Sequence, residues 1–281
     1  MTTVPRVSDG RERAAAGSLA DDAAFAAALA ARAGAVLMER YERVERVDYK
    51  SARDIVTEVD HLSEELIIDG IRARHPGDAI LAEESGEHPT DAGTAPTAGH
   101  GRVWVIDPLD GTVNYANGIP FFCVSIALAI DGRAAAGVVL DPSRNDLFSA
   151  TADGPATLNG HPIAPSDKER LTDFVVQMAL SGRSVATRVR NVRKAIRISR
   201  SMGSSALALS YVGNGRFDAF IQQGGMSNWD VAAAGLIAER AGARVTDAQG
   251  GPWFDVSRGA RGVGVVAAPA AHHEAILALT R

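Results

Sequence analysis

The chain has 281 residues, 46% of them hydrophobic and 22% charged, and its 29 Lys and Arg against 34 Asp and Glu give a formal net charge of −5. This balance is typical of an ordinary globular protein and argues against a dedicated nucleic-acid binder, since such proteins carry an excess of positive charge. The single cysteine, Cys123, excludes an intrachain disulfide and favours a cytoplasmic location. No uninterrupted run of 18 apolar residues predicts a membrane span.

The first part of the chain predicts two helices and a short strand. Residues 1–18 are expected to form a flexible N-terminal tail, and an alanine-rich amphipathic helix should follow over about 20–44. A second helix, which Asp60 would cap, is predicted by apolar residues at helical spacing, namely Leu62, Leu66, Ile67 and Ile71. A strand over 79–82 then leads into Glu83 and Glu84, and residues 88–102 have the composition of a mobile surface loop.

Further strands follow in the same part of the chain. The segment "RVWVID" at 102–107 reads as a buried strand, and "TVNYANG" at 112–118 as a short helix or turn. Apolar runs separated by Asp-Gly turns at 131–132 and 153–154 predict an antiparallel meander. Residues 19–165 are therefore expected to form an N-terminal α+β half.

The remaining residues, 166–281, predict a C-terminal α/β half in which strands and helices alternate. Strands are expected over 173–180, 217–224, 243–250 and 262–269, and helices over 185–201, 202–215 and 229–242. Isolated residues in this part, such as the pair His272 and His273, are expected at the surface, and Trp229 is expected to pack and orient Asp230.

Carboxylates gather where the predicted strands end or helices begin. Glu83 and Glu84 follow one strand, Asp107 and Asp110 follow another in "DPLDGT", and Asp230 opens a helix. Each has a structural alternative, because acidic residues often cap helices and Asp-Gly sequences often form turns. Asp107 is the hardest to explain in this way, since an unpaired charge at the end of an apolar strand is costly.

The segment "DPLDGT" favours a site for a cation and a phosphate group. Mg²⁺ prefers oxygen ligands, and the carboxylates of Asp107 and Asp110 flank the carbonyl of Leu109. The backbone N–H groups of Gly111 and Thr112, at the start of a helix, favour an anion. Carboxylates would repel a phosphate unless cations lay between them, so the combination indicates metal-assisted phosphoryl chemistry.

Four segments, taken in order and spacing, resemble the inositol monophosphatase family of Mg²⁺-dependent, lithium-sensitive sugar phosphatases. They are "DIVTEVD", "AEESG", "WVIDPLDGTVNYANGIPFFCVSIALA" and "WDVAAAGLIAERAGARVTD", and the resemblance extends from about Lys50 to Val266. It implies a layered α-β-α-β-α sandwich with the metal site in the N-terminal half and the active site between the two halves. It also implies a homodimer with two or three Mg²⁺ ions in each active site.

The resemblance assigns roles to residues that match the family motifs. Ligands of a first Mg²⁺ would be Glu83, Asp107 and the Leu109 carbonyl; ligands of a second would be Asp107, Asp110 and Asp230; and Glu84 would hold a water of a third. Thr112, with Asp60 behind it, would orient the attacking water, and Glu83 completes the expected catalytic set. Substrate contacts would come from Asp110, Gly111, Thr112, Gly203, Ser204, Ser205, Gln223 and Asp230. Gln223 stands where the inositol phosphatases usually carry a glutamate.

The predicted activity is that of an inositol-phosphate phosphatase, the hydrolysis of myo-inositol monophosphate or a similar polyol or sugar phosphate. Alternatives within the family are a fructose-1,6-bisphosphatase, a histidinol-phosphatase and a phosphoadenosine-phosphate phosphatase. An alternative of another class is binding to RNA or a transcription complex through the basic helix at 183–200, whose cationic face carries Arg190, Arg193, Lys194 and Arg197. That face is also compatible with a solvated surface or with a site for a second substrate phosphate.

Overall fold

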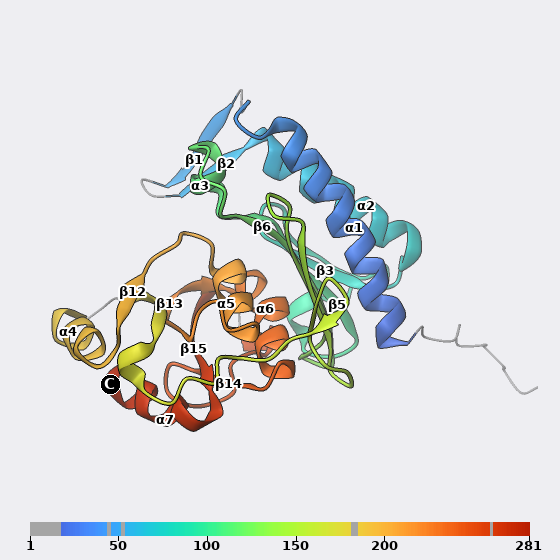
Figure 1. Cartoon of the computed structure of the whole chain (residues 1–281). Coiled ribbons are helices and arrows are strands. Elements are labelled where there is room, and N and C mark those ends of the chain that lie inside the picture. The colour runs from blue at the N-terminus through green and yellow to red at the C-terminus, as the bar shows by residue number, and fades with distance from the viewer. Residues whose placement is uncertain (1–17, 44–45, 52–53, 181–184, 259–260) are drawn as a thin grey trace, which may run out of the picture.

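Two β-sheets and three layers of helices alternate in the fold (Figure 1). The computed structural model describes residues 18–43, 46–51, 54–180, 185–258 and 261–281, so the predicted tail, apart from Ser18, lies outside the described residues. The large sheet has the strand order β10-β9-β8-β7-β6-β5-β3-β4, the small sheet has the order β12-β11-β13-β15-β14, and β1 and β2 form a separate hairpin.

The strands have the following bounds: β1 Val47–Ser51, β2 Asp54–Thr57, β3 Ala79–Ala82, β4 Gly86–His88, β5 Arg102–Asp110, β6 Cys123–Ile130, β7 Arg133–Asp141, β8 Asp146–Thr151, β9 Thr157–Leu158, β10 His161–Pro162, β11 Val175–Ala179, β12 Ile198–Arg200, β13 Ala219–Ser227, β14 Ala243–Asp247 and β15 Arg261–Pro269. The predicted boundary at 165/166 falls in the segment that connects β10 of the large sheet to β11 of the small sheet.

Helices cover both faces of the large sheet. Helices α1 (Leu19–Arg40) and α2 (Glu58–Arg74) pack on one face, and α5 (Ser205–Gly213) and α6 (Asn228–Arg240) lie between the two sheets. Helices α4 (Val185–Ala195) and α7 (Ala270–Leu279) cover the outer face of the small sheet, and the short α3 (Thr112–Ala116) follows β5. The predicted α-β-α-β-α sandwich is confirmed.

Burial on both faces explains why the central strands read as continuous apolar runs. Along β6, Val124, Ile126 and Leu128 pack towards α1 and α2. The alternate residues Cys123 and Ala127 pack towards α5 and α6, so Cys123 is a buried core residue, as predicted. Alternation along the strand thus joins two helix layers through one sheet.

Helix α2 begins differently from the prediction. Its N-cap is Thr57, whose hydroxyl accepts a hydrogen bond from the Val59 N–H at 3.2 Å. Asp60 lies three residues later and accepts from the Thr57 N–H at 2.8 Å, which completes a capping box. The prediction of Asp60 as the cap was therefore wrong by three residues, although its carboxylate does bond to the backbone at the helix start.

The predicted helix over 185–201 was wrong at its C-terminal end, because α4 ends at Ala195 and β12 follows. Ile198 pairs in parallel with Val175 of β11, and the Arg197 N–H bonds to the Phe174 carbonyl at 3.1 Å. Pairing with the sheet edge here outweighs local helix propensity. Residues 183–184 of the predicted basic helix lie outside the described residues.

Several further elements were not expected. The β1–β2 hairpin and helix α7 had no prediction, and residues 88–102 contain a 3₁₀ turn, Pro96–Ala98, that packs against a second turn at Val256–Arg258. His273 on α7 is fully buried and contacts the Thr246 hydroxyl at 3.0 Å, so its expected place at the surface was wrong. Within the described part of the chain, no helix has both the length and the hydropathy to cross a bilayer.

Candidate metal centre

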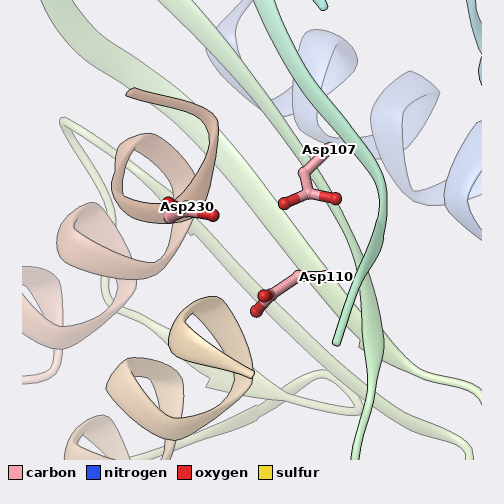
Figure 2. Close-up of side chains that lie close together, drawn as sticks. All are labelled: Asp107, Asp110 and Asp230. Carbon is pink, nitrogen blue, oxygen red and sulfur yellow. The ribbon is translucent and has the colours of Figure 1, made fainter. Parts of the chain in front are cut away.

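Three aspartates from two distant parts of the sequence converge between the sheets (Figure 2). Asp107 and Asp110 come from the end of β5, and Asp230 comes from the first turn of α6. Each offers one carboxylate oxygen, and these three oxygens all lie within 4.8 Å of one another. No described lysine or arginine forms an ion pair with any of them, so the cluster carries mutually repelling charges when ionised.

Asp107 lies deepest in the cluster, with 1% of its surface exposed. Its Oδ1 accepts from the Leu109 N–H at 3.1 Å, whereas its buried Oδ2 receives no hydrogen bond from any described residue. Burial first, and then the negative charges of Glu83, Asp110 and Asp230, raise the pKa of Asp107 well above its usual range. A buried oxygen without a donor fits the position of a cation, which would supply the missing compensation.

Asp230 is held by the helix that carries it. It is the third residue of α6, and its Oδ2 accepts from the Ser227 N–H at 2.6 Å. Burial and then the charge of Asp110 raise the pKa of Asp230 well above its usual range, although the Ser227 bond acts in the opposite direction. One side chain therefore combines a capping role with a place in the cluster.

Asp110 joins the two halves of the chain. Its Oδ2 accepts from the Ser204 hydroxyl at 2.5 Å and from the Ala206 N–H at 2.6 Å, both at the start of α5. Burial raises the pKa of Asp110 to about 6, even though these donors favour its ionised form. The structure thus brings Ser204, a predicted substrate contact, directly to the cluster.

The neighbouring residues of that segment are placed by Asn114 of α3. The Asn114 Nδ2 donates to the carbonyls of Phe121 and Met202, each at 2.7 Å. A Cβ on Gly203 would lie 2.8 Å from the same Asn114 nitrogen, so the backbone at Gly203 passes close to α3. Gly203 and Ser204 are therefore fixed beside the DPLDGT segment.

Thr112 and Asp60 form a hydroxyl–carboxylate pair next to the cluster. The Thr112 hydroxyl lies 3.0 Å from the Asp60 Oδ1 and 3.0 Å from the Leu109 carbonyl oxygen, and it can donate to either. Burial raises the pKa of Asp60 to about 6, against hydrogen bonds from Thr57 and Thr112 that lower it. The predicted pairing of these two residues is present.

Gly111 allows the chain to turn sharply between β5 and α3. Its φ is +98°, and a Cβ at this position would lie 3.0 Å from the Phe121 carbonyl oxygen. A side chain here would be strained as well as crowded, so glycine is needed for the turn that places Thr112 against Asp60.

Glu83 lies beside the cluster rather than among its three closest oxygens. Its negative charge is the largest charge effect on Asp107, and its N–H donates to the Ile106 carbonyl at 3.2 Å. The next two N–H groups, of Glu84 and Ser85, each donate at 2.9 Å to the carboxylate of Glu64 on α2. Hydrogen bonds to β5 and to α2 thus hold the backbone of residues 83–85.

Ser63 and Glu64 were not predicted as site residues. The Ser63 hydroxyl donates to the Pro108 carbonyl at 2.9 Å, inside the DPLDGT segment. Both residues lie on the buried face of α2 between Val59 and Ile67. That polar interruption of an apolar helical face was the sequence signal that could have identified them.

Gln223, predicted to contact the substrate, is not brought to the cluster. Its amide Nε2 donates to the Thr280 carbonyl at 2.7 Å, and its Oε1 accepts from Arg188 of α4, on the outer side of the small sheet. The preceding residue, Gln222, instead has its Oε1 3.4 Å from the Ser205 hydroxyl. Gln222 therefore faces the segment that bonds to Asp110.

A bulge in β13 explains this shift. Residues 223–225 of β13 lie opposite Gly264 alone, because Gln222 pairs with Val265 and Met226 pairs with Val263. Gly224 and Gly225 both have a φ of +78°, which permits the extra residues. Counting residues back from Asp230 in the sequence cannot reveal such a change of side-chain direction.

Comparisons with known proteins agree with this arrangement. A family model described as "Inositol monophosphatase family" matches residues 18–281. The chain is 39% identical over 231 residues to the Nus factor SuhB of Escherichia coli K12, covering 79% of this chain and 83% of that protein. It is 40% identical over 230 residues to the Nus factor SuhB of Salmonella typhimurium LT2, with the same coverage.

Solved structures show the same fold. The extragenic suppressor protein SuhB of Bartonella henselae superposes with a TM-score of 0.84 at 30% identity, covering 94% of this chain and 99% of that one. The IMPase of Thermotoga maritima gives a TM-score of 0.81 at 30% identity, covering 92% and 96%.

The layered sandwich and its buried carboxylate cluster define a phosphatase-type protein with a site suited to divalent cations. The chain belongs to the inositol monophosphatase family.

Proposed function

We propose that this protein is a Mg²⁺-dependent phosphomonoesterase that hydrolyses myo-inositol monophosphate or a similar polyol phosphate. The observation that supports this most strongly is the buried cluster of Asp107, Asp110 and Asp230, which has no cationic partner among the described residues. Three carboxylates this close together, two of them buried, are costly unless a cation binds between them. The chain therefore keeps an arrangement that is expensive for stability and useful for binding metal ions.

The residues present fit two Mg²⁺ ions. Those that would hold them are Glu83, Asp107, the Leu109 carbonyl, Asp110 and Asp230, with Glu84 near a third ion. When bound, Mg²⁺ lowers the pKa of water and neutralises charge on the phosphoryl oxygens. All of these donors are oxygens, which is the ligand type that Mg²⁺ prefers.

Thr112 and Asp60 would orient the attacking water. The Thr112 hydroxyl donates its hydrogen bond to Asp60 or to the Leu109 carbonyl, which leaves its lone pairs free to accept a hydrogen bond from water. Asp60 keeps this orientation because its other oxygen is held by the Thr57 hydroxyl at 2.5 Å. The backbone N–H groups of Gly111 and Thr112 would bind the phosphate.

The substrate would place its ring against the segment that begins α5. Asp110, Asp230, Gly203, Ser204 and Ser205 would contact the ring hydroxyls, and Gln222 would take the place that the sequence suggested for Gln223. The amide of Gln222 both donates and accepts hydrogen bonds and carries no charge. This set of groups favours a neutral polyol over a substrate with a second anionic group.

A panel of phosphate esters tests the proposed activity. The purified protein should release phosphate from inositol 1-phosphate in the presence of Mg²⁺ and should stop when a chelator is added. Fructose 1,6-bisphosphate, histidinol phosphate and 3′-phosphoadenosine 5′-phosphate, the substrates of the alternative activities, should react more slowly. A clear preference for one of these three, or hydrolysis in excess chelator, would contradict the proposal.

Gln222→Leu and Gln223→Leu form a matched pair that tests the substrate contact. We expect Gln222→Leu to raise KM for inositol 1-phosphate about 10-fold, the effect of losing one hydrogen bond to the ring. Gln223→Leu should leave KM within about 2-fold. Neither change should affect hydrolysis of p-nitrophenyl phosphate, which lacks ring hydroxyls. The reverse result, with Gln223→Leu raising KM, would restore the assignment made from the sequence.

A second candidate function is binding to a transcription complex. Relatives that are 39–40% identical are called Nus factors, and α4 exposes Arg190, Arg193 and Lys194, which form no ion pair among the described residues. Reversing these three charges to glutamate should abolish binding to RNA polymerase or RNA in a pull-down while phosphatase activity persists. Absence of binding by the wild-type protein would dispose of this candidate.

The homodimer, the cytoplasmic location and lithium sensitivity stay predictions.

A further inference from the structure

The first two turns of α2 contact three separate segments of the candidate metal centre. Asp60, Ser63 and Glu64 lie at helical positions i, i+3 and i+4, which share one face. They bond respectively to Thr112 of α3, to the Pro108 carbonyl next to Asp107, and to the backbone that follows Glu83. One helix face thus reaches every segment of the N-terminal half that would hold a cation or orient the water.

Glu64 is the member of this face whose position is hardest to explain by stability alone. Only 3% of its surface is exposed, and none of the described lysines or arginines forms an ion pair with it. Its Oε2 accepts from the Glu84 N–H and its Oε1 accepts from the Ser85 N–H, each at 2.9 Å. Two hydrogen bonds to a charged acceptor compensate its burial and fix its orientation.

These bonds restrain the backbone at Glu83. On one side the Glu83 N–H is tied to the Ile106 carbonyl of β5, directly before Asp107, and on the other side Glu64 holds the next two N–H groups. The backbone at Glu83 therefore has little freedom to rotate. Glu83 is thereby held beside the end of β5, next to Asp107.

We infer that Glu64 is a positioning residue that sets the divalent-cation affinity of the site by fixing the 83–85 turn, so that Glu83 faces Asp107. The inference rests on the proposed function, since it requires a cation at the cluster. Glu64 acts through the backbone of Glu84 and Ser85 and does not itself need to contact the ion. Ser63 acts in the same way on the carbonyl of Pro108, one residue before Leu109.

The test compares Glu64→Gln with Glu65→Gln, the same substitution at the adjacent, solvent-exposed position of α2. A glutamine at 64 is nearly isosteric, but only its oxygen can accept, so one of the two backbone N–H groups loses its acceptor. Mg²⁺ binding to each full-length protein is measured by isothermal titration calorimetry, and folding is checked by circular dichroism.

We expect Glu64→Gln to raise the Kd for Mg²⁺ at least 10-fold, while kcat at saturating Mg²⁺ falls less than 3-fold. Glu65→Gln should leave both values unchanged. An unchanged Kd in folded Glu64→Gln overturns this inference alone, whereas no Mg²⁺ binding by the wild type overturns the proposed function and this inference with it.

Glu64→Asp keeps the test decisive if the glutamine variant does not fold. Aspartate retains the charge but is one methylene shorter, so it cannot reach both N–H groups as Glu64 does. A positioning role predicts that the Kd for Mg²⁺ rises in this variant as well. A Kd equal to that of the wild type would mean that only the charge of Glu64 matters and would overturn the positioning role.

Discussion

The strand β5 has a group of buried aspartates at its start and another at its end. The first group is paired with an arginine, and the second has no such partner within the described part of the chain. At its start, the Arg102 guanidinium bonds to both oxygens of Asp22, at 2.8 and 3.1 Å, and to Asp78 at 2.9 Å. At its end, Asp107 and Asp110 face Asp230 with no arginine or lysine paired to them among the described residues. The first group has its cation within the chain, whereas the second has no cationic partner among the described residues.

This difference separates a structural network from a candidate functional one. Buried carboxylates are common at both ends of the strand, so burial alone does not mark a site. What distinguishes the cluster at the end of β5 is the missing compensation, including an Asp107 oxygen without a donor. Substitutions in the two groups should therefore change stability with opposite signs.

The largest effect is expected from Asp107→Asn. It should reduce Mg²⁺-dependent phosphate release about 10³-fold or more, because the charge that would lie between two ions is lost. The same change should raise the Tm of the metal-free protein by about 2–4 °C, since one of several repelling charges is removed. Activity is measured by phosphate release and Tm by calorimetry in chelator. If the metal-free variant were less stable than the metal-free wild type, the aspartates at the end of β5 would not be a source of repulsion.

Arg102→Met should act in the opposite direction. Removing the guanidinium leaves the carboxylates of Asp22 and Asp78 buried without their cation, and the free energy of unfolding should fall by about 3 kcal/mol. The activity of the folded fraction at saturating substrate should stay within about 2-fold of the wild type, because this network lies at the far end of β5. Urea denaturation measures the first quantity and steady-state kinetics the second. An unaltered urea midpoint would show that the network contributes nothing.

A smaller effect is expected from pH in the metal-free protein. Burial raises the pKa of Asp60 and of Asp110 from 3.8 to about 6, so between these values the folded state holds protons that the unfolded state has lost. The free energy of unfolding should therefore fall as the pH rises from 4.5 to 7. Carboxylates whose pKa is lowered, such as Asp173 beside Arg197, titrate below this window.

Added Mg²⁺ should reverse this trend, because it binds the ionised carboxylates and stabilises the folded state above pH 6. Melting curves from pH 4.5 to 7, recorded with chelator and with Mg²⁺, measure both effects. Stability of the chelated protein that rises with pH across the window would contradict the assignment of these raised pKa values.

Local spacing in the sequence predicted most of the candidate site. Asp107, Asp110 and Thr112 lie within six residues, so the geometry of one strand end and one turn brings them together. Asp230 was noted as an acidic residue at a predicted helix start, and its place beside Asp107 and Asp110 followed from the resemblance to the family. The layered fold followed from the resemblance carried by these same segments and is confirmed.

The features that the sequence did not reveal depend on contacts between distant segments. Gln222 rather than Gln223 lies against Ser205 because of a bulge opposite β15, and the strand β12 forms only because β11 offers an edge. Glu64 bonds to a turn 20 residues later, and its role becomes visible only once the fold brings the two together. Hydrophobic periodicity reports burial but does not report such partners.

The fit of α6 against the large sheet has a consequence for exchanging parts between relatives. A Cβ on Gly137 of β7 would lie 2.8 Å from the Cα of Ala233, and the Ser125 hydroxyl bonds to the Trp229 carbonyl at 3.2 Å. A chimaera joined between residues 165 and 166 would therefore combine a sheet from one parent with a helix layer shaped for another. Recombining substrate preferences by domain shuffling should succeed only when β6 and β7 are exchanged together with α6, so these three elements are a better unit of exchange than either half of the chain.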